Sequence, residues 1–347
     1  MDVRKLGRPC VKRVYAEDWM TKRTTIADLA KLLGIDKSSI SLALRDSPKM
    51  SVATRAKVQR VAREQNYTPN WAAKQLAGST SHAIGLVMPS AFACLTHPRV
   101  VQTIRALAGL AAAQGLTLNL IANEHLATSK DRPLLPINAD GLLVWGDVPA
   151  PSTTWFSSAY ARPSIVLDPH HPTYARYQGG AIRIRNKEGA SAVVRHLYER
   201  GARHLTFVQV VTEHLGHEER WRGTKQAWLE RSPAAALRKL FIDELTDDDL
   251  KKLAARGKAA IFCSNDLGAM QVWHRLHRLG ILVPQEIKLA GFDGDEYGAL
   301  VGLTTALFDS EAMAQKAFSG LHRLITKDTD KFGQESIPIT VRIGTTS

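Results

Sequence analysis

The chain has 347 residues, with 46 Lys and Arg against 33 Asp and Glu and a formal net charge of +13; this length suggests two or three domains. Its 44% apolar and 23% charged residues argue against wholesale disorder, and no apolar run reaches the ~18 residues of a membrane-spanning helix. Three scattered cysteines form no C-x-x-C pair and no apolar stretch follows the basic N-terminus, so we expect a cytoplasmic protein without disulfides, zinc or a signal peptide.

Most of the excess positive charge lies near the N-terminus. Residues 1–81 hold 16 Lys and Arg against 7 Asp and Glu, a surplus of +9, and the remaining residues add only +4. This asymmetry is expected of a segment that meets a polyanion, but a solvated basic tail would show it too. The pattern within the segment has to decide between the two.

Three short helices are predicted between residues 25 and 64. Thr25 and Asp28 form the pattern of a capping box, apolar residues follow at helical spacing, and Gly34 ends the helix after about two turns. Asp36 can cap a second short helix, and a third runs over 52–64. Two short helices joined through a glycine turn and closed by a third form a helix-turn-helix, whose second helix can enter the major groove. The spacing alone is also compatible with a three-helix domain that does not bind DNA.

The segment 66–78 reads N-Y-T-P-N-W-A-A-K-Q-L-A-G and predicts a miniature helix. Pro69 and Asn70 mark its start and Gly78 marks its end, which leaves barely two turns. So short a helix is only marginally stable alone in water. We therefore expect this segment to fold when it docks on DNA.

Residues 24–78 resemble the DNA-binding headpiece and hinge of LacI–GalR-type transcriptional regulators. The resemblance is carried by T-I-A-D-L-A-K-L-L-G-I-D-K-S-S-I-S-L-A-L-R, S-V-A-T-R and the segment 66–78, which follow in order with the family's loop lengths. It implies four parts of the chain: a basic, disordered extension (1–23), a helix-turn-helix domain (24–68), a hinge helix (69–80) and an effector-binding and dimerisation domain (81–347). Phosphate contacts from the extension are the alternative to disorder.

The same resemblance implies which side chains meet DNA. Lys37, Ser38 and Leu42 would face base edges, and Leu76 of the hinge helix would wedge into the minor groove. Four polar residues would hold phosphates: Thr25, Ser39, Ser41 and Asn70. Lys37 can donate to guanine and Ser38 can pair with several bases, whereas Leu42 offers only an apolar contact. The chain departs from the common family pattern at Asp36, Leu42 and Ala77, so the operator sequence does not transfer from better-known members.

From residue 81 onward, short apolar runs alternate with amphipathic segments. The predicted strands are 84–88, 116–122, 141–145, 164–167, 205–210, 239–242, 259–263 and 287–292, with a last strand within 337–347. Predicted helices between them include 99–114, 187–200, 220–230 and 267–279. Such alternation predicts two α/β subdomains with parallel sheets, enclosing a cleft at the carboxyl ends of the strands.

Several motifs in this part resemble the family's effector domain, which is similar to periplasmic sugar-binding proteins. They include Arg220-x-x-Gly223, Cys263-Ser264-Asn265-Asp266 and Gly291-Phe292-Asp293. The resemblance implies that Arg220, Asn265 and Asp293 line the cleft beside Phe292, and such groups suit vicinal hydroxyls.

Three more side chains are candidates for the cleft. Trp145 and Trp221 could offer flat faces to a sugar ring, with plain core packing as the alternative. Arg185 stands where an Asp often precedes Asn186, so we expect either an anionic ligand or a cleft that has lost its usual ligand.

Together these patterns predict a cytoplasmic, nucleoid-associated transcriptional regulator, expected to be a repressor, that binds a near-palindromic operator as a homodimer. No leucine heptad follows the last predicted strand, so we expect no tetramer. Its operator affinity would respond to a carbohydrate-like effector; the alternative is a constitutive DNA-binding protein whose ligand-free cleft domain only dimerises. The chain holds no phosphate-cradling loop or nucleophile elbow, so we expect no enzyme. We expect no cofactor and, although His170 and His171 adjoin, no metal.

Overall fold

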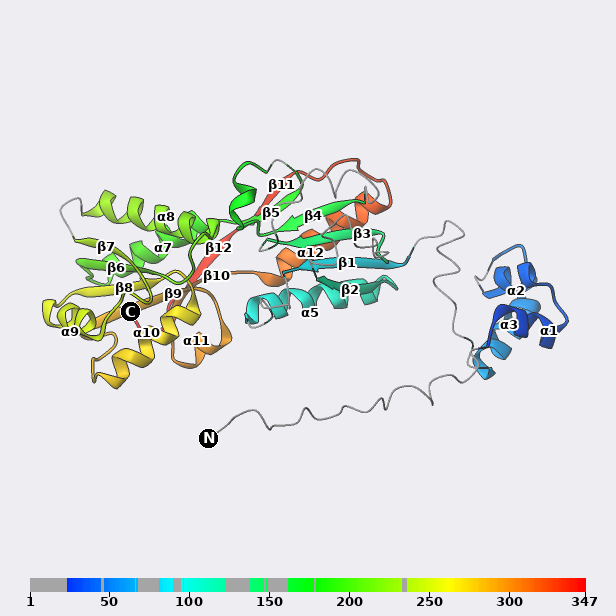
Figure 1. Ribbon diagram of the computed structural model, residues 1–347, viewed down its shortest axis with the longest axis horizontal. Helices are drawn as coiled ribbons and strands as arrows, with labels where there is room; N and C mark the ends of the chain where they lie inside the picture. The colour runs from blue at the N-terminus through cyan, green and yellow to red at the C-terminus, as the bar shows by residue number, and fades with distance from the viewer. Residues whose placement is uncertain are drawn as a thin grey trace, which may run out of the picture. The chain divides into compact units, whose positions relative to one another are not determined.

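The computed structural model describes residues 24–44, 47–65, 67, 81–89, 95, 97–122, 138–146, 148, 162–177, 179–232 and 236–347 (Figure 1). The chain divides into two compact units, residues 1–79 and 80–347, which are described separately. The expected basic extension and hinge helix, with Asn70 and Leu76, lie outside the described residues. None of the helices described has the length and apolar character that crossing a membrane requires.

The N-terminal unit contains the three predicted helices, α1 (Ile26–Leu33), α2 (Lys37–Leu44) and α3 (Val52–Glu64). The capping box is confirmed: the Thr25 hydroxyl accepts from the Asp28 backbone N–H, and the Asp28 carboxylate accepts from that of Thr25. Gly34 ends α1 with φ of 64°, a left-handed conformation that glycine adopts without steric cost. The helices close over a small core, whose buried members are Leu29, Ile40, Ala43, Val58 and Ala62.

The first lobe of the larger unit is built on a six-stranded sheet. Its strands are β1 (Ala83–Met88), β2 (Thr117–Ala122), β3 (Gly141–Trp145), β4 (Ser164–Leu167), β5 (Ala181–Ile184) and β11 (Gln334–Ile337). They lie in the order β11-β5-β4-β3-β1-β2, and every pairing is parallel. The helices α5 (Pro98–Ala113) and α12 (Ser310–Ile325) pack on this sheet around a core that includes Leu107, Leu143 and Leu321. A short 3-10 helix, η3 (Pro172–Arg176), follows β4.

The second lobe repeats this plan. Its strands are β6 (His204–Gln209), β7 (Leu237–Phe241), β8 (Ala259–Cys263), β9 (Ile287–Asp293), β10 (Thr304–Phe308) and β12 (Ile339–Arg342), in the order β12-β10-β9-β8-β6-β7. Successive residues of its strands face opposite layers: Phe207 packs with α7 (Asn186–Glu199) and α8 (Leu215–Arg231), and Val208 with α9 (Asp247–Arg256) and α10 (Asp266–Arg278). The short α11 (Glu296–Leu300) follows β9, and β12 alone runs antiparallel to its neighbour.

The chain crosses between the lobes three times among the described residues. The crossings lie between β5 and α7, between β10 and α12, and between β11 and β12. The late elements therefore divide between the lobes, as the orange and red ribbons show in Figure 1. Two α/β lobes with largely parallel sheets confirm the predicted fold class, and the carboxyl ends of the strands open onto the space between the lobes.

Some element boundaries differ from the sequence prediction. α8 begins at Leu215 rather than Arg220, because the ring of His214 accepts from the backbone N–H of His217 and caps the helix. β7 begins two residues earlier than expected and ends one residue earlier, since Leu237 already pairs with Leu205 in the sheet. The strands β5, β10 and β11 were not predicted.

Candidate functional site

The first turn of α2 forms an exposed polar surface on the N-terminal unit. Lys37 and Ser38 are exposed, and Ser39 is partly buried. Leu42 lies one turn further on, is partly buried and is not among the described residues that pack the core of this unit. The predicted base-facing side chains therefore share one surface and are not consumed by core packing.

Asp36 caps this helix and holds its first turn in place. Its carboxylate accepts from the Ser39 backbone N–H at 2.9 Å and from the Ser38 hydroxyl. These bonds, with that of Ser38 foremost, hold the pKa of Asp36 well below its usual value, so the group is an anion at neutral pH. The Ser38 hydroxyl must leave this partner, or use its lone pairs, when it meets a base.

The residues predicted to contact phosphate differ in how exposed they are. Thr25 is exposed, but its hydroxyl serves the capping box of α1 and also donates to the Asp28 carboxylate at 2.7 Å. Ser39 and Ser41 are partly buried on α2. Their contacts with phosphate stay predictions.

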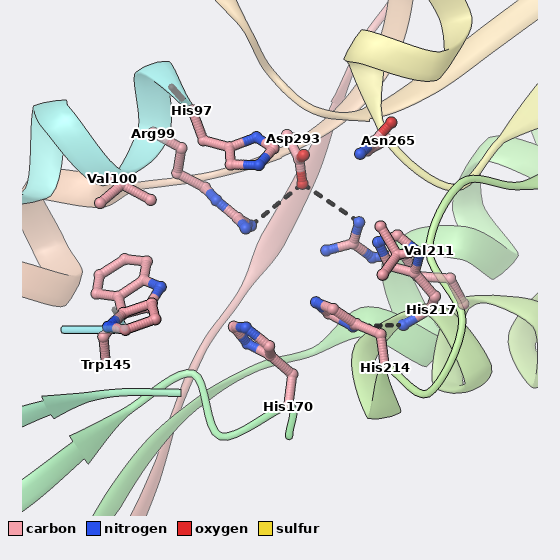
Figure 2. A pocket seen from close by; sticks show the side chains of 12 residues that line it. His97, Arg99, Val100, Trp145, His170, Val211, His214, His217, Asn265 and Asp293 are labelled. Carbon is pink, nitrogen blue, oxygen red and sulfur yellow. Dashed lines mark hydrogen bonds and ion pairs between the residues drawn. The ribbon is translucent and has the colours of Figure 1, made fainter. Parts of the chain in front are cut away.

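A cavity of about 320 Å³ lies between the two lobes of the larger unit (Figure 2). Its walls come from loops and helix starts that follow the carboxyl ends of β1, β3, β4, β6, β8 and β9. The lining residues are Pro89, His97, Arg99, Val100, Trp145, His170, Val211, His214, His217, Arg220, Asn265 and Asp293. Among the described residues this cavity occupies the place where such sheets bind ligands.

One carboxylate joins two guanidinium groups across the cavity, as Figure 2 shows. Oδ1 of Asp293, at the end of β9, lies 3.1 Å from Nη1 of Arg99 and 3.3 Å from Nη1 of Arg220. Arg99 comes from α5 in the first lobe, whereas Asp293 and Arg220 belong to the second lobe. The Arg99–Asp293 pair therefore bridges the lobes.

Arg220 is buried and held from several sides. Its Nε donates to the Asn186 side-chain oxygen at 2.9 Å, and its Nη1 donates to the Ser264 carbonyl oxygen at 2.5 Å. Its guanidinium also lies 3.7 Å from the centre of the Phe292 ring, a cation–π contact. Arg220 is thus a fixed part of the wall.

Three histidines form a stack along another wall. The ring centres of His170 and His214 lie 4.1 Å apart, and those of His214 and His217 lie 4.2 Å apart. Burial, followed by the nearby positive charges, lowers the pKa of both His214 and His217, so both rings are neutral at neutral pH. His217 Nδ1 also lies 3.1 Å from the Ser264 hydroxyl.

Asp293, which lines the cavity, and Asp168, which does not line it but contacts the lining residue His170, are held in unusual backbone conformations. Asp168, which lies 3.5 Å from His170 Nδ1, has φ of 48°, and Asp293 has φ of 128°. Burial raises the pKa of Asp168, but the interaction with His170, followed by the charges of Arg99 and Arg220, outweighs burial and lowers the pKa to about 2. Backbone strain of this kind persists where the surroundings fix it, commonly at functional sites.

The structure brings together four of the seven predicted cleft residues: Trp145, Arg220, Asn265 and Asp293. The other three are not among the described residues that line the cavity. Phe292 is buried beneath it under Arg220. Trp221 faces away, into the α7–α8 layer, with its ring centre 5.5 Å from that of Phe207. For Trp221, core packing is therefore the reading that the structure favours.

The prediction that Arg185 lies in the cleft and favours an anionic ligand is wrong, because Arg185 does not line the cavity. This residue is exposed at the first crossing between the lobes, and its Nε donates to the Ser336 hydroxyl at 3.0 Å. The sequence reasoning missed Arg99 and the histidines His97, His170, His214 and His217 as cleft residues. The position of Arg99 and His97 at the start of a predicted helix after a predicted strand was the available signal.

Comparison with known families gives two matches. A model described as bacterial regulatory proteins, lacI family, matches residues 25–70, and one described as a periplasmic binding protein-like domain matches residues 194–347. The HTH-type transcriptional regulator GntR of Escherichia coli K12 is 26% identical over 317 residues, which cover 88% of this chain and 92% of GntR. The HTH-type transcriptional repressor PurR of Aliivibrio fischeri MJ11 is 26% identical over 289 residues, 79% and 83% of the two chains.

Solved structures share the fold. The lac repressor dimer bound to operator and the anti-inducer ONPF matches with a TM-score of 0.75 and 21% identity, covering 94% of this chain and 99% of that one. The transcriptional regulator CelR in complex with cellobiose matches with a TM-score of 0.63 and 18% identity, covering 94% and 100%.

Proposed function

The chain is a bacterial regulatory protein of the lacI family, with a helix-turn-helix domain and a periplasmic binding protein-like domain, and on this premise we propose that it represses transcription under the control of a small effector. The effector binds in the cavity between the lobes, against the part of the wall that is formed by Trp145, Arg220, Asn265 and Asp293. The observation that carries this proposal is the cavity itself, which gathers polar side chains from six strand ends into one place. The solved structure of the transcriptional regulator CelR in complex with cellobiose supports a carbohydrate-like effector.

On the DNA side, we assign base reading to Lys37, Ser38 and Leu42 of α2. Phosphate contacts fall to Thr25, Ser39 and Ser41, with Asn70, and Leu76 inserts into the minor groove. The lac repressor crystallised as a dimer on its operator supports a homodimer on a near-palindromic site. A protein that acts on DNA in this way works in the cytoplasm at the nucleoid, and we assign it no catalytic activity, because the matched relatives are regulators.

The effector acts by changing how the lobes approach each other. In this structure the lobes are tied by the Arg99–Asp293 pair, by a bond from the Gln102 amide to the Glu296 carboxylate at 3.0 Å, and by one from the Leu215 N–H to the His170 carbonyl at 2.7 Å. A ligand that enters the cavity competes for the first of these. It shifts operator affinity only if it binds the open and closed lobes differently.

One observation favours a second candidate, a constitutive DNA-binding protein whose cleft takes no ligand. The charged groups of the cavity already satisfy one another through the Arg99–Asp293–Arg220 ion pairs. Thermal-shift screening with sugars and sugar acids separates the two, because a ligand of the folded state raises the melting temperature by linkage.

Selection of DNA by the purified full-length protein from a random pool tests the DNA-binding proposal. We expect enrichment of a near-palindromic site with a flexible pyrimidine–purine step at its centre. A pool without sequence enrichment would overturn it.

A further inference from the structure

Arg99 is a cationic group that the cleft presents from the first lobe. It lies in the first turn of α5, and its side chain is 15% exposed, whereas that of Arg220 is 1% exposed. Its guanidinium lies 4.7 Å from the centre of the Phe308 ring and pairs with Asp293. Arg99 therefore borders the cavity with a charged group that a ligand can reach.

The wall of the cavity is rich in hydrogen-bond donors. Arg99 and Arg220 can only donate, and so can the indole of Trp145. The side-chain oxygen of Asn265 accepts from the Gly268 N–H at 2.8 Å, which leaves its amide N–H groups for a ligand. Figure 2 shows the Asn265 nitrogen on the side of the cavity.

Few acceptors balance these donors. Among the described lining residues the one carboxylate is that of Asp293, and it is already shared by the two guanidiniums. The neutral ring of His214 already accepts from the His217 backbone N–H through Nδ1, so its other nitrogen can only donate. The other three histidines of the wall, His97, His170 and His217, add at most one acceptor nitrogen each. The best complement of such a wall is a group that only accepts, and an oxyanion is that group.

The remaining geometry calls for hydroxyl groups on the same ligand. An oxyanion that takes the place of Asp293 at Arg99 leaves Asp293 paired with Arg220 and able to accept from ligand hydroxyls. The cavity volume of about 320 Å³ is at the small end of ligand pockets, which run from ~300 to ~1,000 Å³, and this suits one sugar-sized unit.

We propose that the ligand of this cleft is an acidic sugar derivative, a hydroxyl-bearing ring or chain with one carboxylate or phosphate, and that Arg99 receives the acid group. The proposal rests on the proposed function of the cleft as an effector site. It replaces Arg185, which lies outside the cavity, with a residue that lines it.

The test uses matched ligand series that differ only at the acid position. Calorimetry and thermal shift with the full-length protein compare glucose, glucuronate and glucose 6-phosphate, then galactose, galacturonate and galactose 6-phosphate, and ribose with ribose 5-phosphate. At least one acid should bind more than tenfold more tightly than its neutral counterpart. Comparing the carboxylates with the phosphates then shows which acid group the cleft takes.

Three variants assign the effect to a residue. Arg99→Gln should weaken binding of the acid about tenfold to hundredfold, the range for losing a charged hydrogen-bond partner, and should leave any weak binding of the neutral sugar nearly unchanged. Arg99→Lys keeps the charge and should recover part of the loss. Arg105→Gln removes the same charge from an exposed position of α5 and should bind like the wild type.

Three results would overturn the proposal: a neutral sugar that binds as tightly as its acid, unchanged binding of the acid by Arg99→Gln, or no binding of any acid at millimolar concentration. If a neutral sugar binds and Asn265→Ala abolishes that binding, the acidic ligand class is wrong but the cleft is still an effector site. An acid that binds through Arg99 without changing operator affinity would instead sink the proposed function and leave this inference standing.

Discussion

Lys37 is the side chain with the most specific predicted role at the level of single residues. It starts α2, is exposed, and can donate to the O6 and N7 atoms of guanine, a common specific contact in the major groove. Because the helix is held by the Asp36 cap and by core residues such as Ile40, removing the Lys37 side chain leaves the fold in place. Its effect should therefore appear in DNA recognition alone.

Lys37→Ala should lower discrimination at one or two operator positions by about 1–3 kcal/mol. Competition binding against all single-base variants of the selected operator measures this. Lys57→Ala on α3, which removes the same charge from another exposed position, is the matched control and should show no loss at single positions. Loss of affinity spread evenly over every sequence in Lys37→Ala would mean that Lys37 contacts phosphate instead.

His217 makes stability depend on pH. Burial, then the charge of Arg220, lowers its pKa well below the usual 6.5, so the folded protein keeps the ring neutral while the unfolded chain takes up a proton as the pH falls through 6.5. The unfolded state then binds more protons than the folded state. The contribution of His217 is therefore fully present above pH 6.5 and is lost as the pH falls below it.

Denaturation of the wild type and of His217→Gln at a series of pH values tests this. The difference between their unfolding free energies should change by up to about 1.4 kcal/mol per pH unit below pH 6.5, at the expense of the wild type. Asp266, whose pKa burial raises to about 7, titrates nearby but is present in both proteins. A difference that stays constant from neutral pH to about pH 5 would contradict the assignment.

Motifs next to strand ends identified three residues of the cavity wall, but Phe292 of the same motifs is buried beneath Arg220 instead. Arg220, Asn265 and Asp293 belong to recognisable motifs next to strand ends. Arg99 reaches the cavity only because the start of α5 faces the second lobe, and the three-ring stack joins His170 after β4 to His214, the N-cap residue of α8, and to His217 within that helix. The spacing of residues along the sequence cannot predict such contacts, because they join residues that are far apart in the chain.

At the scale of elements, the packing of α7 on α8 sets the shape of one layer of the second lobe. The helices approach so closely that a methyl group on Gly223 of α8 would overlap the carbonyl oxygen of Lys187 in α7. Backbone cannot yield as a flexible side chain can, so the site requires glycine. The same approach positions Arg220, one turn earlier on α8, beside Asn186 at the start of α7.

Gly223→Ala should destabilise the protein by about 1–3 kcal/mol, the usual effect of overpacking. Thermal or urea denaturation of the larger unit measures it. The control is Gly109→Ala on α5, where nothing lies within 4 Å of the added methyl, and this variant should be neutral or more stable by up to about 1 kcal/mol. Equal stability of the two variants would show that α7 can move away without cost.

The elements that the sequence did not predict have weak local signals. Arg183 interrupts β5, two threonines open β10, and β11 (Q-E-S-I) is a polar edge strand. These strands gain their stability from pairing, such as Ile182 with Glu335 and Ala290 with Thr304, rather than from an apolar run. The continuous apolar strands β1, β3 and β8, buried on both faces, were predicted within a residue of their ends.

At the scale of the whole molecule, three crossings join the two lobes within the described part of the chain, and the cavity lies between these lobes. Arg185 braces two of these crossings, since its side chain bonds Ser336 and its backbone N–H donates to the Ile337 carbonyl oxygen at 3.2 Å. A ligand in the cavity would therefore affect the same movement that the contacts between the lobes restrict, which is the opening or closing of the cleft. We expect a ligand to move the two lobes relative to each other as rigid bodies, rather than to change only the side chains around it.

Occupation of the cleft should change the affinity of the protein for its operator. Fluorescence anisotropy on the selected operator, with and without a ligand shown by calorimetry to need Asn265 and Arg99, tests it most directly. The Kd for the operator should change about 5- to 150-fold in one direction, and variants that do not bind the ligand should keep one Kd throughout. An operator Kd that stays the same while the cleft is saturated would show that the cleft does not control DNA binding.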